Sequence, residues 1–177
     1  MTRLSRRRIL LATAAVSLGI GPATARAASF ETRALSFIHL HTGERLSLPY
    51  FHGGEYRPDA LAAVNHLLRD FRTGDVGTMD PVLLDVLHAL AGVTGSRQPF
   101  QIICGYRSAA TNEALRRRSA GVAGASLHMQ GRAIDVRLAD VPLERLRDAA
   151  LGLRAGGVGY YVAPQFVHVD TGRVRAW

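Results

Sequence analysis

The stretch Ser126-Leu-His-Met-Gln-Gly-Arg-Ala-Ile-Asp135 is the most informative segment of the chain, because it passes from a polar, glycine-containing loop into an apolar strand. The strand is predicted over 133–138, where apolar residues dominate. His128 therefore stands in the loop and Asp135 on the strand. Gly131 lies between them, where a turning chain often needs a positive φ angle or a close approach that only glycine allows.

The segments on either side alternate between predicted strands and helices. Asp80 before Pro81 and Ser108 before Ala109 have side chains that are preferred at the N-cap of a helix. Alternating apolar residues predict strands, and apolar residues at intervals of three and four predict helices. The predicted elements are a hairpin over 35–48 ended by Pro49, helices over 58–72, 81–95 and 109–118, a strand over 100–104, a fourth helix over 142–156, and strands over 158–162 and 166–169. The sequence thus predicts a mixed α+β domain.

The last predicted strand has two different faces. Because side chains alternate along a strand, His168 and Asp170 point away from the valines on either side of His168. His128, Asp135 and His168 then form a candidate zinc site, since three protein ligands and an open position for water define a hydrolytic zinc centre. On spacing alone this evidence is weak, because an isolated histidine is more often an ordinary core or surface residue than a ligand.

Cys104 is the one cysteine of the chain, so no internal disulfide can form. It stands in the apolar run Phe100-Gln-Ile-Ile-Cys104, which predicts a buried strand. Because buried cysteines act mostly as small apolar residues, we expect Cys104 to have a packing role rather than a reactive one.

Residues 1–27 have the features of an export signal. The head Ser5-Arg-Arg-Arg-Ile-Leu10 resembles the twin-arginine signature, the apolar run over 9–20 is too short to span a bilayer, and Ala25-Arg-Ala27 fits a signal peptidase site. An arginine-rich arm that binds nucleic acid is less favoured, because an apolar run and a cleavage site follow the arginines. We therefore predict a twin-arginine-type signal peptide, a protein exported to the periplasm or cell envelope, and no membrane span in the mature form.

The predicted mature chain, residues 28–177, has the length of one domain. The signal segment carries five arginines and no acidic residue, so its removal lowers the formal net charge from +8 to +3. This mild positive charge suits an acidic wall polymer and does not require nucleic acid as a partner. A single domain is predicted, and a monomer is assumed.

Two segments resemble the metal motifs of a known enzyme family. The stretch 126–135 resembles the S-x-H-x-x-G-x-A-x-D pattern of the zinc D-alanyl-D-alanine peptidases, and Val167-His-Val-Asp170 resembles their second ligand motif. The family includes lysostaphin-like enzymes, bacterial D,D-peptidases and the hedgehog signalling domain. The chain further resembles the murein endopeptidase K subgroup from about Leu35 to Trp177, through His41-Thr-Gly-Glu44, Asn65-His-Leu-Leu-Arg-Asp70, Gly105-Tyr-Arg-Ser108 and Gly156-Gly-Val-Gly-Tyr-Tyr161.

The resemblance implies a hedgehog/D,D-peptidase-like α+β fold, with a central, largely antiparallel sheet flanked by helices. It also implies one Zn²⁺ ion held by His128, Asp135 and His168. The expected activity is zinc-dependent hydrolysis of peptide cross-links in peptidoglycan, with a metal-activated water as nucleophile and stem peptides as the partner. The alternatives are a D,D- or L,D-carboxypeptidase, and a catalytically silent zinc domain that binds wall peptides or a protein partner.

Substrate contacts follow from the same resemblance. Arg107, a candidate catalytic and substrate-binding residue, matches an arginine that holds a carboxylate or carbonyl of the substrate in related carboxypeptidases, and a guanidinium can make two parallel hydrogen bonds to such a group. The alternative is a surface arginine at a helix start. Ser126 is expected to orient the site in a similar way. Alternation turns only one of Tyr160 and Tyr161 toward the metal; the sequence leaves the choice open, and Tyr161 is the candidate substrate contact.

The general base is where the chain departs from the family. Relatives place a histidine two residues before the last ligand or a glutamate three before it, and these positions hold Phe166 and Gln165. Neither side chain can accept a proton at neutral pH. Asp170 shares a strand face with His168 and is the candidate catalytic residue, either as the base at the metal water or as a residue that orients the ligand. His52 is a more distant alternative.

Overall fold

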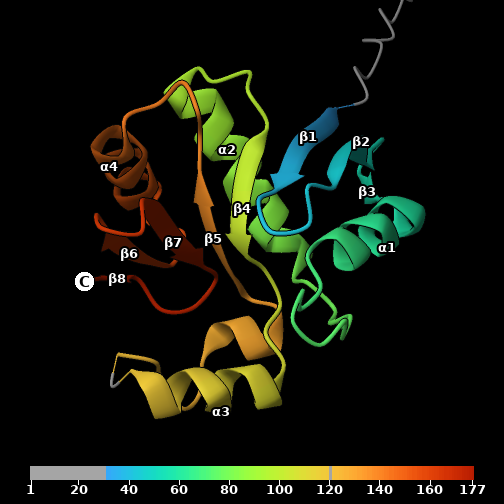
Figure 1. Cartoon of the computed structure of the whole chain (residues 1–177). Helices are drawn as coiled ribbons and strands as arrows, with labels where there is room; N and C mark the ends of the chain where they lie inside the picture. Colours follow the sequence, from blue (N-terminus) through green and yellow to red (C-terminus); the bar gives the residue numbers. More distant parts are fainter. Residues whose placement is uncertain (1–30, 120) are drawn as a thin grey trace, which may run out of the picture.

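In the computed structural model, residues 31–119 and 121–177 are described. The predicted signal peptide over 1–27 lies outside these residues. The described strands join one eight-stranded sheet with helices packed around it (Figure 1). In chain order the elements are β1 (Thr32–His39), β2 (Arg45–His52), β3 (Glu55–Tyr56), α1 (Pro58–Leu67), α2 (Pro81–Thr94), β4 (Phe100–Cys104), α3 (Ala109–Arg118), the short 3-10 helix η1 (Leu127–Gln130), β5 (Ala133–Arg137), α4 (Leu143–Leu153), β6 (Gly157–Tyr161), β7 (Phe166–Asp170) and β8 (Arg175–Ala176).

The sheet is mixed, with the strand order β3-β2-β1-β4-β5-β7-β6-β8. Among the described strands, β1 runs parallel to β4 and β6 parallel to β8, and all other neighbours are antiparallel. Helices α2 and α4 contact each other, and α4 also contacts β6 and β7. Figure 1 shows α3 near the ends of β4 and β5, away from α2 and α4. The predicted α+β class with a largely antiparallel sheet is confirmed.

The hydrophobic core lies on the side of the sheet that faces α2 and α4. Strand β5 contributes Ile134 and Val136 to this core, and β7 contributes Val167 and Val169, all of them almost completely buried. Each such aliphatic side chain stabilises the fold by about 1.5–3 kcal/mol. Because neighbours along a strand point to opposite faces, the residues between these apolar positions lie on the other side of the sheet. The predicted alternation of side chains along β7, with the valines on one face and His168 and Asp170 on the other, is confirmed.

The first helix ends earlier than predicted, at Leu67 instead of residue 72. Leu68 leaves the helix, and its carbonyl oxygen accepts a hydrogen bond of 2.8 Å from the backbone N–H of Tyr106. Asp70 then turns its carboxylate toward the start of α3, where Oδ2 accepts hydrogen bonds from the backbone N and the Oγ of Ser108 at 2.9 and 2.7 Å. These buried bonds to a distant segment outweigh the helical spacing of the apolar residues.

Pro49 was expected to end the second strand, but β2 continues to His52. The pairing with β1 shifts between Arg33 and Ala34, because Ala34 lies opposite Pro49 whereas Arg33 lies opposite Phe51. A bulge of this kind accommodates a proline, which has no N–H to donate to the neighbouring strand.

The predicted helix caps agree with the structure. The Asp80 side chain accepts a hydrogen bond from Val82 N, and α2 ends at Gly95 in the left-handed conformation. The Ser108 side chain accepts a hydrogen bond from Thr111 N at the start of α3. Capping depends on residues within one turn of the helix end, so it can be predicted from short sequence patterns.

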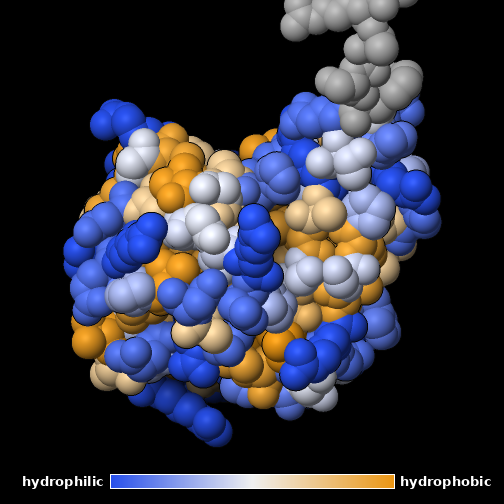
Figure 2. Space-filling view, turned by 90° about the horizontal axis from the view of Figure 1, so that it is seen from above, coloured by the Kyte–Doolittle hydropathy of each residue, from blue (hydrophilic) through white to orange (hydrophobic). Residues whose placement is uncertain are grey.

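The surface mixes polar and apolar side chains. On the face shown in Figure 2, hydrophobic areas are interspersed with hydrophilic ones. The exposed apolar residues include Val82 and Val93 at opposite ends of α2, Leu151 on α4, and Val76 and Val162 in loops. Scattered apolar residues are ordinary on a protein surface. Within residues 31–119 and 121–177, no helix has the length and apolar character that crossing a bilayer requires.

Candidate metal centre

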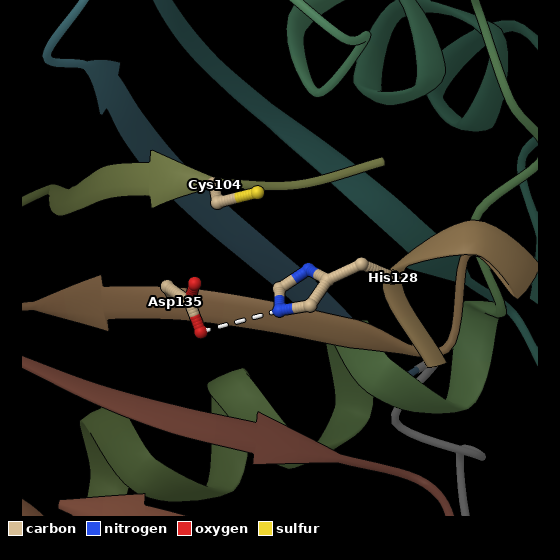
Figure 3. Close-up of side chains that lie close together, drawn as sticks. All are labelled: Cys104, His128 and Asp135. Atoms are coloured by element: carbon tan, nitrogen blue, oxygen red, sulfur yellow. Dashed lines mark ion pairs between the residues drawn. The ribbon is translucent and has the colours of Figure 1, made fainter. Parts of the chain in front are cut away.

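Two neighbouring strands, β5 and β7, and η1 bring the predicted ligands together. Asp135 of β5 lies opposite His168 of β7, and on its other side it lies opposite Cys104 of β4. His128 reaches the same place from η1 (Figure 3). The side chains of His128, Asp135 and His168 are all buried. Residues that are distant in sequence thus form one buried cluster.

The ligand atoms of the three predicted residues lie at nearly equal distances. His168 Nδ1 is 2.9 Å from Asp135 Oδ1, and His128 Nε2 is 3.3 Å from the same oxygen. The two nitrogens are 3.2 Å apart. Ligand atoms that each lie about 2 Å from a tetrahedral zinc ion are about 3.3 Å from one another. The cluster therefore has the dimensions of three corners of such a site.

Hydrogen bonds on the outer side of each imidazole determine which nitrogen faces the cluster. His128 Nδ1 lies 2.8 Å from the carbonyl oxygen of Gly105, so it must carry the proton that it donates. His168 Nε2 lies 3.1 Å from Asp170 Oδ2 and likewise donates. With the rings neutral, a lone pair from each points inward beside the Asp135 carboxylate. Three acceptor atoms at such distances need a cation between them, either a metal ion or an added proton.

The charges of the cluster depend on one another. Burial lowers the pKa of His128, but the Asp135 carboxylate outweighs this effect and raises the pKa to about 10 when no metal is bound. Burial raises the pKa of Asp135, but His128 and His168 outweigh it and hold that pKa well below its usual range. In the metal-free protein at neutral pH, His128 is therefore a cation beside a carboxylate. A metal ion would take the place of that added proton.

Cys104 offers a second way to complete a ligand set, since the ligand atoms of Cys104, His128 and Asp135 lie within 4.8 Å of one another. We prefer the set of His128, Asp135 and His168, because the ligand atoms of this set are closer together. In addition, the second ring nitrogen of His168 is held by the Asp170 carboxylate. Cys104 is buried, as predicted. Its position beside the site was not predicted: the pairing of β4 with β5 shifts between Ile102 and Cys104, and this bulge turns Cys104 to the face of Asp135.

Gly131 makes the turn between His128 in η1 and Asp135 on β5 possible. It has a φ angle of 65°, in the left-handed region. A Cβ atom at this position would also collide with the backbone carbonyl of Thr78. The prediction that the backbone requires glycine here is confirmed.

A cavity of about 460 Å³ opens over the cluster, a volume in the usual range for small-ligand sites. Tyr161 lines it, whereas Tyr160 packs against the core and donates a hydrogen bond of 2.7 Å to Glu144 Oε1. Of the two tyrosines, the structure thus brings Tyr161 to the site. The lining includes the predicted residues Arg107, Ser126 and Tyr161, and also Phe166, Arg175 and Trp177. The substrate contacts assigned to Arg107, Ser126 and Tyr161 stay predictions.

Arg107 lines the cavity beside the cluster. Its Nη1 donates to Asn112 Oδ1 at 3.3 Å, and its Nη2 contacts Cys104 Sγ at 3.5 Å. Its Nε is buried and has no hydrogen-bond partner among the described residues. An unsatisfied buried donor costs free energy, and because this atom is closed off from solvent, an oxygen atom from outside reaches it only if the side chain moves.

Comparison with known proteins shows to which family this chain belongs. Residues 27–177 match the protein family described as peptidoglycan L,D-endopeptidase MepK. The chain belongs to this family. The predicted resemblance to the murein endopeptidase K subgroup is thereby confirmed, and so is the prediction of a metallopeptidase.

Relatives in this family match nearly the whole chain. The Escherichia coli K12 protein named peptidoglycan L,D-endopeptidase MepK is 45% identical over 175 residues, which cover 97% of this chain and 96% of the relative. The Haemophilus influenzae protein named probable peptidoglycan L,D-endopeptidase MepK is 42% identical over 176 residues, with 97% and 95% covered. No solved structure matches the chain.

Asp170 lies behind His168, the last of the predicted ligands. Its Oδ2 contacts Nε2 of His168, whereas Nδ1 of the same ring faces Asp135. Its carboxylate also accepts hydrogen bonds from Gly157 N at 2.9 Å and Gly172 N at 2.8 Å, and its side chain is completely buried. Of the two roles predicted for Asp170, this position favours orienting the ligand over acting as the base.

The other candidate for the base does not reach the cavity. His52 lies at the end of β2 and makes a hydrogen bond of 2.8 Å to Thr32 Oγ1. Two strands, β1 and β4, separate β2 from β5 in the sheet. The structure therefore does not bring His52 to the metal centre.

Two residues of the site were missed by the sequence reasoning. Arg175 Nη2 lies 2.6 Å from Asp170 Oδ2, and the ring of Trp177 lies 5.2 Å from the ring of His168. No local pattern predicts these contacts, because β8 pairs with β6 and not with β7. The sequence offered one signal for them: an arginine and a tryptophan follow the motif Val167-His-Val-Asp170 within seven residues.

Proposed function

We propose that this protein is a zinc-dependent endopeptidase that hydrolyses an L,D peptide bond in peptidoglycan cross-links. The observation that carries the proposal is the convergence of three acceptor atoms, from His128, Asp135 and His168, at the base of a cavity. Relatives that match nearly the whole chain, named L,D-endopeptidases, support the choice of bond.

In this proposal His128, Asp135 and His168 hold one Zn²⁺ ion. The bound ion supplies a Lewis acid that polarises the scissile carbonyl and lowers the pKa of a water molecule. The chain keeps the ligands in the binding state, because Gly105 O and Asp170 Oδ2 accept the outer protons of the two rings. The inner nitrogens are then free to bind the metal.

The walls of the cavity provide groups for the stem peptide. Arg107 lines the cavity, and its guanidinium is suited to a carboxylate or carbonyl oxygen of the substrate. The Tyr161 hydroxyl accepts a hydrogen bond of 2.8 Å from Trp177 Nε1, which leaves its own proton for a substrate oxygen. Ser126, at the start of η1, lines the same cavity.

A catalytically silent zinc domain is the second candidate function, and one observation favours it. Among the described residues that line the cavity, the proposed ligands are the only carboxylate and imidazole groups. Phe166 and Gln165 cannot accept a proton, and Asp170 is assigned the orienting role. Water activation would then depend on the metal and its ligands alone.

The deciding experiment digests purified muropeptide dimers, one set joined by L,D cross-links and the other by D,D cross-links. The zinc-loaded protein should convert the L,D dimer to monomers, a chelator should stop the reaction, and added zinc should restore it. His168→Ala should be inactive, whereas the matched control His66→Ala, in α1, should keep wild-type activity. Zinc binding without cleavage of either dimer would support the silent domain. Release of a terminal residue from monomeric stems would indicate a carboxypeptidase, and a protein that binds no zinc would overturn the proposal.

We further propose that residues 1–27 direct export by the twin-arginine route and that the mature domain, residues 28–177, works as a monomer in the periplasm or cell envelope. The basic head, short apolar run and Ala25-Arg-Ala27 support this proposal. Sequencing the N-terminus of the protein from an envelope fraction should find Ala28. Replacing Arg6 and Arg7 together by lysine should keep the chain in the cytoplasm; unchanged export would exclude the twin-arginine route.

A further inference from the structure

We propose that Arg175 positions the metal ligand His168 by holding Asp170, which makes the C-terminal strand β8 part of the metal centre. The inference rests on the proposed function, because it takes His168 as a zinc ligand. Arg175 acts through another residue, so it is a positioning residue and not a catalytic one. Neither the metal motifs nor the family resemblance assigns it a role.

Arg175 holds the same carboxylate oxygen that holds His168. Its Nη2 lies 2.6 Å from Asp170 Oδ2, and its Nη1 lies 3.1 Å from Asp170 Oδ1. Oδ1 has two further donors, the backbone N–H groups of Gly157 and Gly172. Oδ2 has only His168 and Arg175 as partners among the described residues. The guanidinium therefore fixes the oxygen on which the orientation of the imidazole depends.

Burial makes this contact important. The Asp170 side chain has no exposed area, whereas 30% of the Arg175 side chain is exposed. A buried carboxylate that loses a charged partner must turn or admit water. Either change would release Nε2 of His168 and let Nδ1 move out of line with Asp135 and His128. Arg175 thus keeps a ligand aimed at the metal without touching the metal.

Two neighbours fix the guanidinium itself. Its Cζ lies 4.7 Å from the centre of the Trp177 ring, an arrangement in which a cation interacts favourably with an aromatic face. Gly157 leaves the space that the ion pair occupies, because a Cβ atom there would collide with the Arg175 guanidinium and the Asp170 carboxylate. The ion pair between Arg175 and Asp170 thus explains why residue 157 is a glycine.

Arg147 provides a matched control in the same molecule. Its Cζ lies 4.6 Å from the centre of the Tyr160 ring, and its Nη2 lies 2.7 Å from Asp148 Oδ1. Its side chain is also 30% exposed. Arg147 therefore has the same exposure, an aromatic neighbour and an ion pair, but its acidic partner is 62% exposed and belongs to α4 instead of a ligand strand.

The test compares Arg175→Met, Arg175→Lys and Arg147→Met in the full mature protein. Zinc affinity is measured by competition with a chromogenic chelator, the fold by thermal melting of the zinc-free protein, and kcat/KM with a cross-linked muropeptide. Arg175→Met should bind zinc about 10–100-fold more weakly, the usual effect of losing a residue that supports a metal ligand. Arg175→Lys should recover part of the loss, because lysine keeps the charge but not the forked geometry. Arg147→Met should bind zinc like the wild type.

The outcomes separate the inference from the proposed function. Wild-type zinc affinity in Arg175→Met overturns the inference, even if the zinc-free variant melts at a lower temperature, because Arg175 would then serve only the fold. If Arg175→Met does not fold, Arg175→Gln decides, and wild-type zinc affinity in that variant overturns the inference. A wild-type protein that binds no zinc refutes the proposed function itself, and the inference with it.

Discussion

Asp135 of β5 and His168 of β7 lie directly opposite each other in the sheet, and their Oδ1 and Nδ1 atoms are 2.9 Å apart. Antiparallel pairing places these two side chains on the same face with little freedom to move. The third proposed ligand, His128, comes from η1 and points at the same carboxylate. Protons and a metal ion therefore compete for one set of atoms.

Zinc affinity should rise with pH, and binding should release a proton. Burial lowers the pKa of His128, but the Asp135 carboxylate raises it to about 10, so zinc must displace a proton at neutral pH. Release of one proton corresponds to roughly tenfold tighter binding per pH unit between about pH 7 and pH 9. Calorimetry in buffers of different ionisation enthalpy measures the proton count. An affinity that does not change over this range would contradict the assignment of His128.

The same raised pKa of His128 makes the metal-free fold less stable as the pH rises, whereas zinc binding becomes tighter. Because the folded pKa of His128 lies above its ordinary value of 6.5, its contribution to stability is complete below pH 6.5. That contribution is lost as the pH rises toward 10. Urea unfolding of the zinc-free protein across this range should show the decline, and His128→Gln should remove it.

Asp170→Asn should weaken zinc binding about 10–100-fold, because the amide loses the charge that orients His168. Turnover at saturating zinc should stay close to that of the wild type. Competition with a chelator and steady-state kinetics measure the two effects, with Asp148→Asn as the control. Wild-type zinc affinity together with a turnover at least about a hundredfold lower would instead identify Asp170 as the general base.

Arg107→Lys should lower kcat/KM for a cross-linked muropeptide by about ten- to a hundredfold, because lysine loses the paired hydrogen bonds of the guanidinium. Zinc affinity should not change. The exposed Arg97→Lys is the matched control. If zinc affinity and cleavage fall by the same factor, Arg107 supports the fold of the site and does not bind the substrate.

Gly131→Ala should destabilise the metal-free protein by about 1–3 kcal/mol, because its φ angle of 65° is unfavourable for alanine and the new Cβ atom meets the Thr78 carbonyl. Gly92→Ala is the control: this helical glycine has open space around it, and the change should stabilise α2 by about 0.5–1 kcal/mol. Urea unfolding measures both. Wild-type stability of Gly131→Ala would show that the turn between η1 and β5 relaxes without cost.

Features that depend on nearby residues were predictable from the sequence. The Asp80 and Ser108 caps act within one helical turn, and the alternation that places His168 opposite the core valines is a property of any half-buried strand. The end of α1 was not predictable, because Asp70 leaves the helical pattern to accept hydrogen bonds from Ser108, 38 residues later. No pattern within α1 contains that information.

The proposed ligand set comes from the resemblance of two short motifs to those of the zinc D-alanyl-D-alanine peptidases, since the spacing of His128, Asp135 and His168 alone is weak evidence. Only the tertiary structure decided on which side of the His168 imidazole Asp170 lies. It also decided that Tyr161, and not Tyr160, lines the cavity. The contact of Arg175 with Asp170 also came only from the tertiary structure, because β8 reaches the site by pairing with β6. The physical reason is that rotamers and pairing between distant strands result from packing of the whole sheet, which no short stretch of sequence specifies.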